Sequence, residues 1–103
     1  MSGVLLIRYT ARAEGDLLAI ADYLGTKRGA HFAKAYVGRI RTRIETLQQN
    51  PTRFRERGEL GEGRRVISSG PFLIFYRVIE TIVMVDRVLH SARKMNVELL
   101  DEK

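Results

Sequence analysis

The chain has no cysteine and only two histidines among its 103 residues. Without cysteine it can form neither a disulfide framework nor a thiolate metal site, and two histidines far apart in sequence make a poor zinc site. The sequence therefore predicts no bound metal and no cofactor.

Long apolar runs are also missing. No segment approaches the about 20 apolar residues that a membrane-spanning helix needs, and residues 1–8 lack the basic leader and the cleavage site of a signal peptide. We therefore expect a cytoplasmic protein with no membrane contact. A chain of 103 residues suits one core better than two, so we expect a single domain over 1–103 with a short tail from about residue 94.

Positive charge is abundant. Eighteen lysines and arginines face twelve aspartates and glutamates, which gives a net charge of +6. This excess favours a polyanionic or acidic partner, although many small soluble domains carry it without such a role. The second predicted helix holds Lys34, Arg39, Arg41 and Arg43 on its outer face, a pattern that is typical of a solvated helix surface.

The hydrophobic periodicity predicts one strand, two helices and then three strands. Helices grouped apart from strands indicate an α+β fold, with a helical hairpin packed on one face of an antiparallel sheet whose last three strands form a meander. The expected elements are a strand at 4–9, a helix from Thr10 to Gly25, a second helix between Gly29 and Asn50, a polar loop at 52–63, and strands at 64–68, 72–78 and 82–89.

Four segments carry a resemblance to a known family. They are YTARAEGDL at 9–17, NP at 50–51, GPFLIFYRV at 70–78 and RVLHSAR at 87–93. In this order, around this pattern of elements, the chain resembles the RelE/ParE superfamily of toxins from bacterial type II toxin–antitoxin modules. It is most similar to the ParE branch.

The resemblance implies a small toxin that a cognate ParD-like antitoxin covers and neutralises. Such an antitoxin usually binds DNA through its N-terminal part, so operator DNA would be bound only indirectly. ParE-like members inhibit DNA gyrase by binding it, whereas RelE-like members are ribosome-dependent messenger ribonucleases. Because both use one scaffold, the fold cannot choose between them.

The ribonuclease alternative needs groups that move two protons and cations that stabilise the phosphate. The candidates are Arg64, Arg65, His90 and Arg93. A histidine suits proton transfer near neutral pH, but no second proton-transfer group is evident beside it. We therefore expect His90 to be hydrogen-bonded to a backbone carbonyl or a carboxylate at the strand end and to hold the tail in place.

Other positions depart from the ribonuclease pattern. Phe72 and Leu73 stand where several ribonuclease members have an arginine, and 97–100 offers no tyrosine where such enzymes place a general base. The leading hypothesis is therefore a gyrase inhibitor without chemistry of its own. A simple basic nucleic-acid binder is a third alternative, weakened by the absence of a recognition helix or a stacking platform.

The predicted target-binding residues are Arg77, Arg87, His90 and Arg93, around one end of the sheet. A charge within a sheet is costly to bury without a partner. We expect an internal ion pair for Asp86, and either a pair or an exposed sheet face for Arg77 and Arg87. A turn centred on Glu80 puts both arginines on one face, and a turn half a residue further on reverses this relation.

Overall fold

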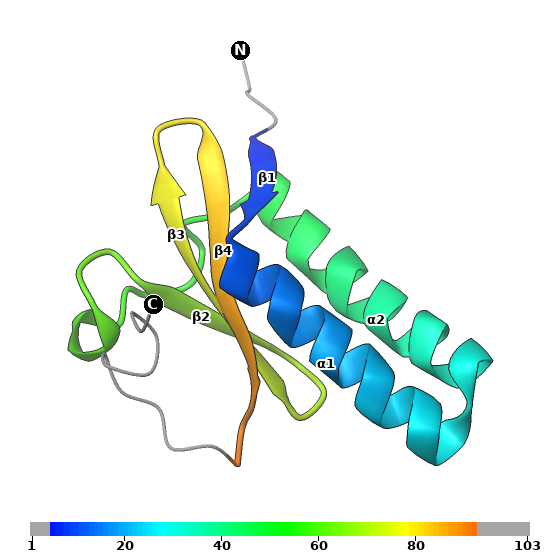
Figure 1. The fold of residues 1–103 in the computed structure, drawn as a ribbon. Helices are drawn as coiled ribbons and strands as arrows, with labels where there is room; N and C mark the ends of the chain where they lie inside the picture. Colours follow the sequence, from blue (N-terminus) through cyan, green and yellow to red (C-terminus); the bar gives the residue numbers. More distant parts are fainter. Residues whose placement is uncertain (1–4, 93–103) are drawn as a thin grey trace.

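The computed structural model describes residues 5–92, which form one sheet covered on one face by two helices (Figure 1). The predicted α+β fold with its helical hairpin is confirmed. The predicted tail from about residue 94 lies outside the described residues. The elements are β1 (Leu6–Tyr9), α1 (Ala11–Arg28), α2 (Ala30–Glu45), β2 (Arg65–Ser69), β3 (Phe72–Ile79) and β4 (Ile82–His90), with short 3₁₀ turns at Thr46–Gln48 and Gly58–Leu60.

The strands lie in the order β1-β4-β3-β2. Strands β2, β3 and β4 form the predicted antiparallel meander, but β1 pairs with β4 in parallel, with Leu6 opposite Ile82. The sheet is therefore mixed and not antiparallel throughout. Side-chain patterns mark which segments are extended, whereas the direction of β1 depends on where the helical hairpin returns the chain.

Helix α1 begins where the sequence predicts and ends later. The hydroxyl of Thr10 caps it by accepting a hydrogen bond from the N–H of Ala13 at 3.0 Å. The predicted end at Gly25 is wrong, because the helix continues to Arg28 and stops at Gly29, whose φ of 96° suits only glycine well. Gly25 lies within the helix, where a Cβ added to it would make an ordinary contact with the Cβ of Ala33 at 4.0 Å.

The main core lies between the helices and the inner face of the sheet. Both α1 and α2 contribute buried apolar side chains to it. Truncation of one of its large aliphatic side chains to alanine costs about 2–5 kcal/mol. Its buried members are Ala13, Leu17, Ile20, Ile40, Ile44, Leu47, Ile67, Ile74, Tyr76, Val83, Val85 and Val88.

A smaller apolar cluster covers part of the outer face of the sheet. Leu60, Phe75 and Leu89 are buried in it. Leu60 belongs to the segment that the sequence predicts as a polar loop, and a bridge between Glu56 and Arg65 pairs this segment with the edge of β2. The outer face near β3 and β4 is therefore partly covered by the segment between α2 and β2.

Candidate functional site

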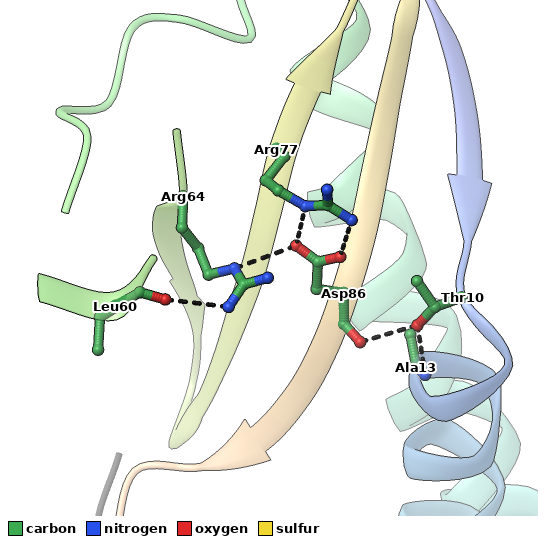
Figure 2. Close-up of polar contacts among 6 residues, drawn as sticks. All are labelled: Thr10, Ala13, Leu60, Arg64, Arg77 and Asp86. Atoms are coloured by element: carbon green, nitrogen blue, oxygen red, sulfur yellow. Dashed lines mark hydrogen bonds and ion pairs between the residues drawn. The ribbon is translucent and has the colours of Figure 1, made fainter. Parts of the chain in front are cut away.

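The charged residues of the β3–β4 hairpin meet at Asp86. Arg77 donates from Nη2 to Oδ1 at 2.6 Å and from Nε to Oδ2 at 2.8 Å, and Arg64 donates from Nε to Oδ2 at 3.2 Å (Figure 2). Arg64 also donates from Nη1 to the C=O of Leu60 at 2.9 Å. The Asp86 side chain is only 5% exposed. We call Arg64, Arg77 and Asp86 the Asp86 network.

The register of the hairpin explains this network. Ile79 lies opposite Ile82, so the turn residues are Glu80 and Thr81, and Glu80 adopts a φ of 56°. This is the second of the two registers considered from the sequence, and it brings Arg77 and Asp86 together. A bulge opposite the Phe75/Tyr76 step leaves Asp86 as the extra residue of β4, because its neighbours on both sides have partners in β3.

The network is also connected to helix α1. The hydroxyl of Thr10 donates to the C=O of Asp86 at 2.8 Å while it caps the helix (Figure 2). Asp86 therefore has two roles. Its side chain binds the arginines on the outer face of the sheet, and its backbone C=O binds the residue that caps α1.

Arg87 forms a separate internal ion pair. It donates from Nε and Nη2 to the carboxylate of Asp16 in α1 at 2.8 and 2.9 Å, and the N–H of Val88 donates to the same carboxylate at 2.9 Å. Arg87 is 6% exposed. The exposed sheet face considered for Arg87 is therefore wrong, because its guanidinium is used to hold β4 against α1. Its direct contact with a target stays a prediction, which this burial disfavours.

His90 lies at the exposed end of β4. Its ring meets Phe72 edge-on, with 5.4 Å between the ring centroids, and its Nδ1 accepts a hydrogen bond from the N–H of Ala92 at 3.0 Å. The backbone partner of this histidine is therefore an N–H group, and not the carbonyl or carboxylate expected from the sequence. An accepting Nδ1 leaves the proton of a neutral ring on Nε2.

A pocket of about 340 Å³ opens between α1 and this end of the sheet. Tyr23, which is 63% exposed, stands at its rim. We call it the sheet-end pocket, and it is lined by Asp16, Ala19, Ile20, Tyr23, Phe72, Val88, Leu89 and His90.

A second hollow of about 780 Å³ lies between the two helices. Small residues, among them Ala21, Gly25 and Gly38, line this interhelical groove together with charged Asp22 and Lys34. Both hollows therefore border on α1, which also exposes 67% of Leu18.

The ribonuclease candidates do not converge. Ser69 of β2 and His90 of β4 both lie opposite Phe72, so they are at the same height along the strands. Arg65 is four residues from Ser69 along β2. At the usual rise of a strand, Arg65 is therefore displaced from His90 by roughly 13 Å along the strand direction. Arg64 belongs to the Asp86 network, and Arg93 lies outside the described residues.

Residues 5–92 contain no group of three side chains of the kinds that could hold a metal ion. None of the helices in this part of the chain is long and apolar enough to cross a membrane.

A family model described as the ParE toxin of type II toxin–antitoxin systems matches residues 7–95, nearly the whole chain. The chain belongs to this ParE toxin family. The superfamily read from four sequence segments is confirmed, and the chain is the toxin of a type II toxin–antitoxin system.

Relatives of this ParE-family chain carry names from both branches of the superfamily. Toxin RelE2 of Caulobacter vibrioides is 32% identical over 87 residues, covering 82% of this chain and 93% of that protein. Toxin ParE1 of the same organism is 29% identical over 92 residues, covering 89% and 95%. The names of these relatives do not select a mechanism.

Solved structures share the fold. A chain of the chromosomal ParDE system from P. aeruginosa aligns with a TM-score of 0.75 and 25% identity, covering 84% of this chain and 96% of that one. A chain of the RelBE2 toxin–antitoxin complex from Mycobacterium tuberculosis aligns with a TM-score of 0.61 and 24% identity, covering 90% and 97%. The same scaffold therefore occurs under both names.

Asp16 is the important residue that the sequence analysis missed. A helical projection contained the signal, because Asp16 lies three residues after Ala13 and four before Ile20, both of which are buried. A carboxylate on an inward face needs a buried cation, and Arg87 is the one that meets it.

Proposed function

We propose that this toxin inhibits DNA gyrase by binding it, without cleaving RNA, and that a ParD-like antitoxin neutralises it. The separation of the candidate ribonuclease residues carries this proposal. Arg64 is 7% exposed and bonded to Asp86, and Arg65 lies far along β2 from His90. A phosphoryl-transfer site needs its cation and its proton-transfer group at one phosphate.

The target surface proposed here is the end of the sheet around His90. This side chain is exposed and is held in one orientation by Phe72 and Ala92. A pre-oriented side chain loses little entropy on binding, which favours a role as a contact residue. Arg77, 34% exposed in its ion pair with Asp86, is a second contact candidate from the same hairpin. It lies five residues along β3 from Phe72, the partner of His90, so the prediction that both lie around one end of the sheet is wrong.

Antitoxin binding is proposed for the surface of α1 and the sheet-end pocket. Leu18 and Tyr23 expose large apolar areas on this helix, and such areas on a small protein often mark an interaction surface. The solved relatives from P. aeruginosa and M. tuberculosis are toxin–antitoxin systems by their descriptions, which supports a partner of the same kind.

A supercoiling assay with purified gyrase tests the proposed target. The folded chain should inhibit supercoiling, and addition of the antitoxin from its own operon should restore it. His90→Ala should weaken inhibition by at least about tenfold if the histidine is a central contact. His31→Ala is the matched control, because it removes an exposed histidine from the start of α2, and it should inhibit like the wild type.

Messenger RNA cleavage is the second candidate function, favoured by the similarity to Toxin RelE2. It would use Arg64, Arg65, His90 and Arg93. Mapping RNA 5′ ends after induction separates the two functions. New ends within translated codons, together with unchanged gyrase activity at molar excess of toxin, would replace gyrase inhibition by ribonuclease activity.

A further inference from the structure

Phe54, in the segment between α2 and β2, is contacted by arginines from three parts of the chain. The guanidinium carbon of Arg43 in α2 lies 5.6 Å from the centroid of the Phe54 ring, and that of Arg53 lies 5.2 Å from it. Arg65 of β2 donates a hydrogen bond from Nη1 to the C=O of Phe54. We call Arg43, Arg53, Phe54 and Arg65 the Phe54 cluster.

Hydrogen bonds to neighbouring elements hold the cluster in place. Arg43 donates from Nε to the C=O of Ser68 at 3.0 Å. The hydroxyl of Tyr76 donates to the C=O of Pro51 at 2.7 Å, which fixes the backbone just before Arg53. The cations are therefore presented by fixed backbone, and this lowers the entropy that a ligand must offset.

The cluster carries more positive charge than its carboxylates balance. Glu56 approaches Arg65 at 3.3 Å, and the Nε of Arg65 is buried without an acceptor among residues 5–92. Within the same residues, Arg43 and Arg53 form no ion pair. Since both lie on one ring, their separation is on the order of the Debye length, about 10 Å at 0.1 M salt. Their fields therefore add in solution.

The hydroxyl of Tyr76 lies within the positive electrostatic field of the same cluster. Burial raises the pKa of Tyr76, and the positive charges of Arg65 and Arg43 oppose this rise. Two cations from different elements thus act on one hydroxyl at the edge of the cluster.

We propose that the Phe54 cluster binds the phosphodiester groups of a nucleic acid strand. Guanidinium groups match the geometry of phosphate oxygens and stay charged at every physiological pH. The Phe54 ring already carries two guanidiniums, so it orients cations and is not a platform for a base. Such a site reads backbone charge and not sequence. This contact goes beyond gyrase inhibition and antitoxin binding.

An acidic peptide would offer anions of similar geometry. A stable protein contact also needs apolar anchors in a pocket, and both the sheet-end pocket and the interhelical groove are lined by residues outside the cluster. The net charge of +6 also favours a polyanion. These observations favour nucleic acid over an acidic protein.

Fluorescence anisotropy with a short DNA duplex and a single-stranded RNA tests the proposal on the full chain, between about 50 and about 200 mM salt. Arg53→Gln should weaken binding about three- to tenfold and reduce the salt slope by about one. Arg53→Lys should keep most of the affinity, because it keeps the charge. Arg43→Gln should weaken binding by a similar factor.

Arg28→Gln is the matched control. It removes the same charge from another stacked arginine, 4.2 Å from the centroid of the Phe32 ring in the helical hairpin. Its affinity should stay within about twofold of the wild type. Equal losses for Arg28→Gln and Arg53→Gln would overturn the proposal, because net charge alone would then explain binding.

Two further outcomes would also overturn it. One is the absence of wild-type binding at the lowest salt concentration, and the other is displacement of the nucleic acid by polyglutamate as efficiently as by unlabelled nucleic acid. Tighter binding of either DNA or RNA supports the site and identifies the source of the phosphate. Circular dichroism checks each fold, and Arg53→Gln keeps the test decisive if Arg43→Gln, which loses its bond to Ser68, does not fold. Gyrase is absent throughout, so the result is independent of the proposed target.

Discussion

The Asp86 network and the Phe54 cluster are both built from arginines, but they differ in what surrounds the charge. In the network, a buried carboxylate receives three N–H groups from Arg64 and Arg77. In the cluster, Arg43 and Arg53 lie on an aromatic ring without a carboxylate partner in the described chain. Arginines that the fold neutralises support structure, whereas those that it leaves in a shared positive field are available for a ligand.

The largest effect on this contrast is expected from Asp86→Asn. The substitution keeps the size of the side chain but leaves two guanidiniums facing a neutral amide, so the free energy of unfolding should fall by about 3–5 kcal/mol. Urea unfolding followed by circular dichroism measures it. Glu59→Gln, which breaks the exposed pair with Arg57, is the control and should leave the midpoint unchanged. A loss below about 1 kcal/mol for Asp86→Asn would mean that water already screens the network.

Asp16→Asn should have the next largest effect. It weakens the bidentate pair with Arg87 but can still accept the N–H of Val88, so we expect a loss of about 2–3 kcal/mol in the free energy of unfolding. The same urea titration applies. Glu14→Gln, in the same helix, breaks an exposed pair with Arg41 and should cost less than about 1 kcal/mol. Similar losses for the two variants would contradict a special role for the buried pair.

Tyr76→Phe tests the contrast between the two sites at the edge of the Phe54 cluster. Loss of the hydrogen bond to Pro51 should cost about 1 kcal/mol at neutral pH. Burial raises the pKa of Tyr76 in the folded chain, so the unfolded chain loses its proton first. The resulting stability is complete below a pH of about 10 and is lost as the pH rises through the folded pKa.

Tyr76→Phe should therefore show a shallower alkaline decline than the wild type. Urea unfolding at neutral pH and above pH 10 measures this decline, with about 10 being the ordinary tyrosine pKa. Tyr23→Phe, at an exposed tyrosine, should follow the wild-type curve. An unchanged slope in Tyr76→Phe would assign the alkaline decline to other groups, among them Tyr9, whose pKa burial also raises.

The smallest effect on stability is expected from Arg53→Gln, within about 0.5 kcal/mol of the wild type. The arginine is exposed and the neighbouring Arg43 repels it, so little is lost when its charge is removed. Thermal unfolding measures this. A combination of unchanged stability and weakened nucleic-acid binding is the expected signature of a ligand site, while a loss above about 2 kcal/mol would make Arg53 a structural residue like those of the network.

Much of the fold could be predicted from sequence because its signals are local. The start of the first helix at Thr10, the pairing of two helices into a hairpin and the order of the elements were all confirmed. The end of α1 was predicted at Gly25, but the helix runs to Arg28 and Gly29 caps it, since a glycine tolerated within a helix and one that ends it look alike in sequence. The parallel direction of β1 also escaped prediction.

The candidate site was less predictable. The predicted contact residues were Arg77, Arg87, His90 and Arg93, chosen from their place in and after one hairpin. Of the three that the structure describes, only His90 is largely exposed. The outcome for the arginines depended on a bulge at Asp86 and on Asp16, 71 residues from Arg87 along the chain. Neither is a local property of the hairpin.

By itself, the sequence determined the α+β class, the toxin family and the excess of positive charge, because periodicity, short motifs and composition are local properties of the chain. Tertiary structure decided which of those charges are neutralised. Arg64, which precedes β2, and the strand residues Arg77 and Arg87 are paired with Asp86 or Asp16. Arg43 and Arg53 share the Phe54 ring and have no carboxylate partner among residues 5–92. The electrostatic environment of a side chain depends on distances across the fold, and these distances exist only once the helices have packed on the sheet.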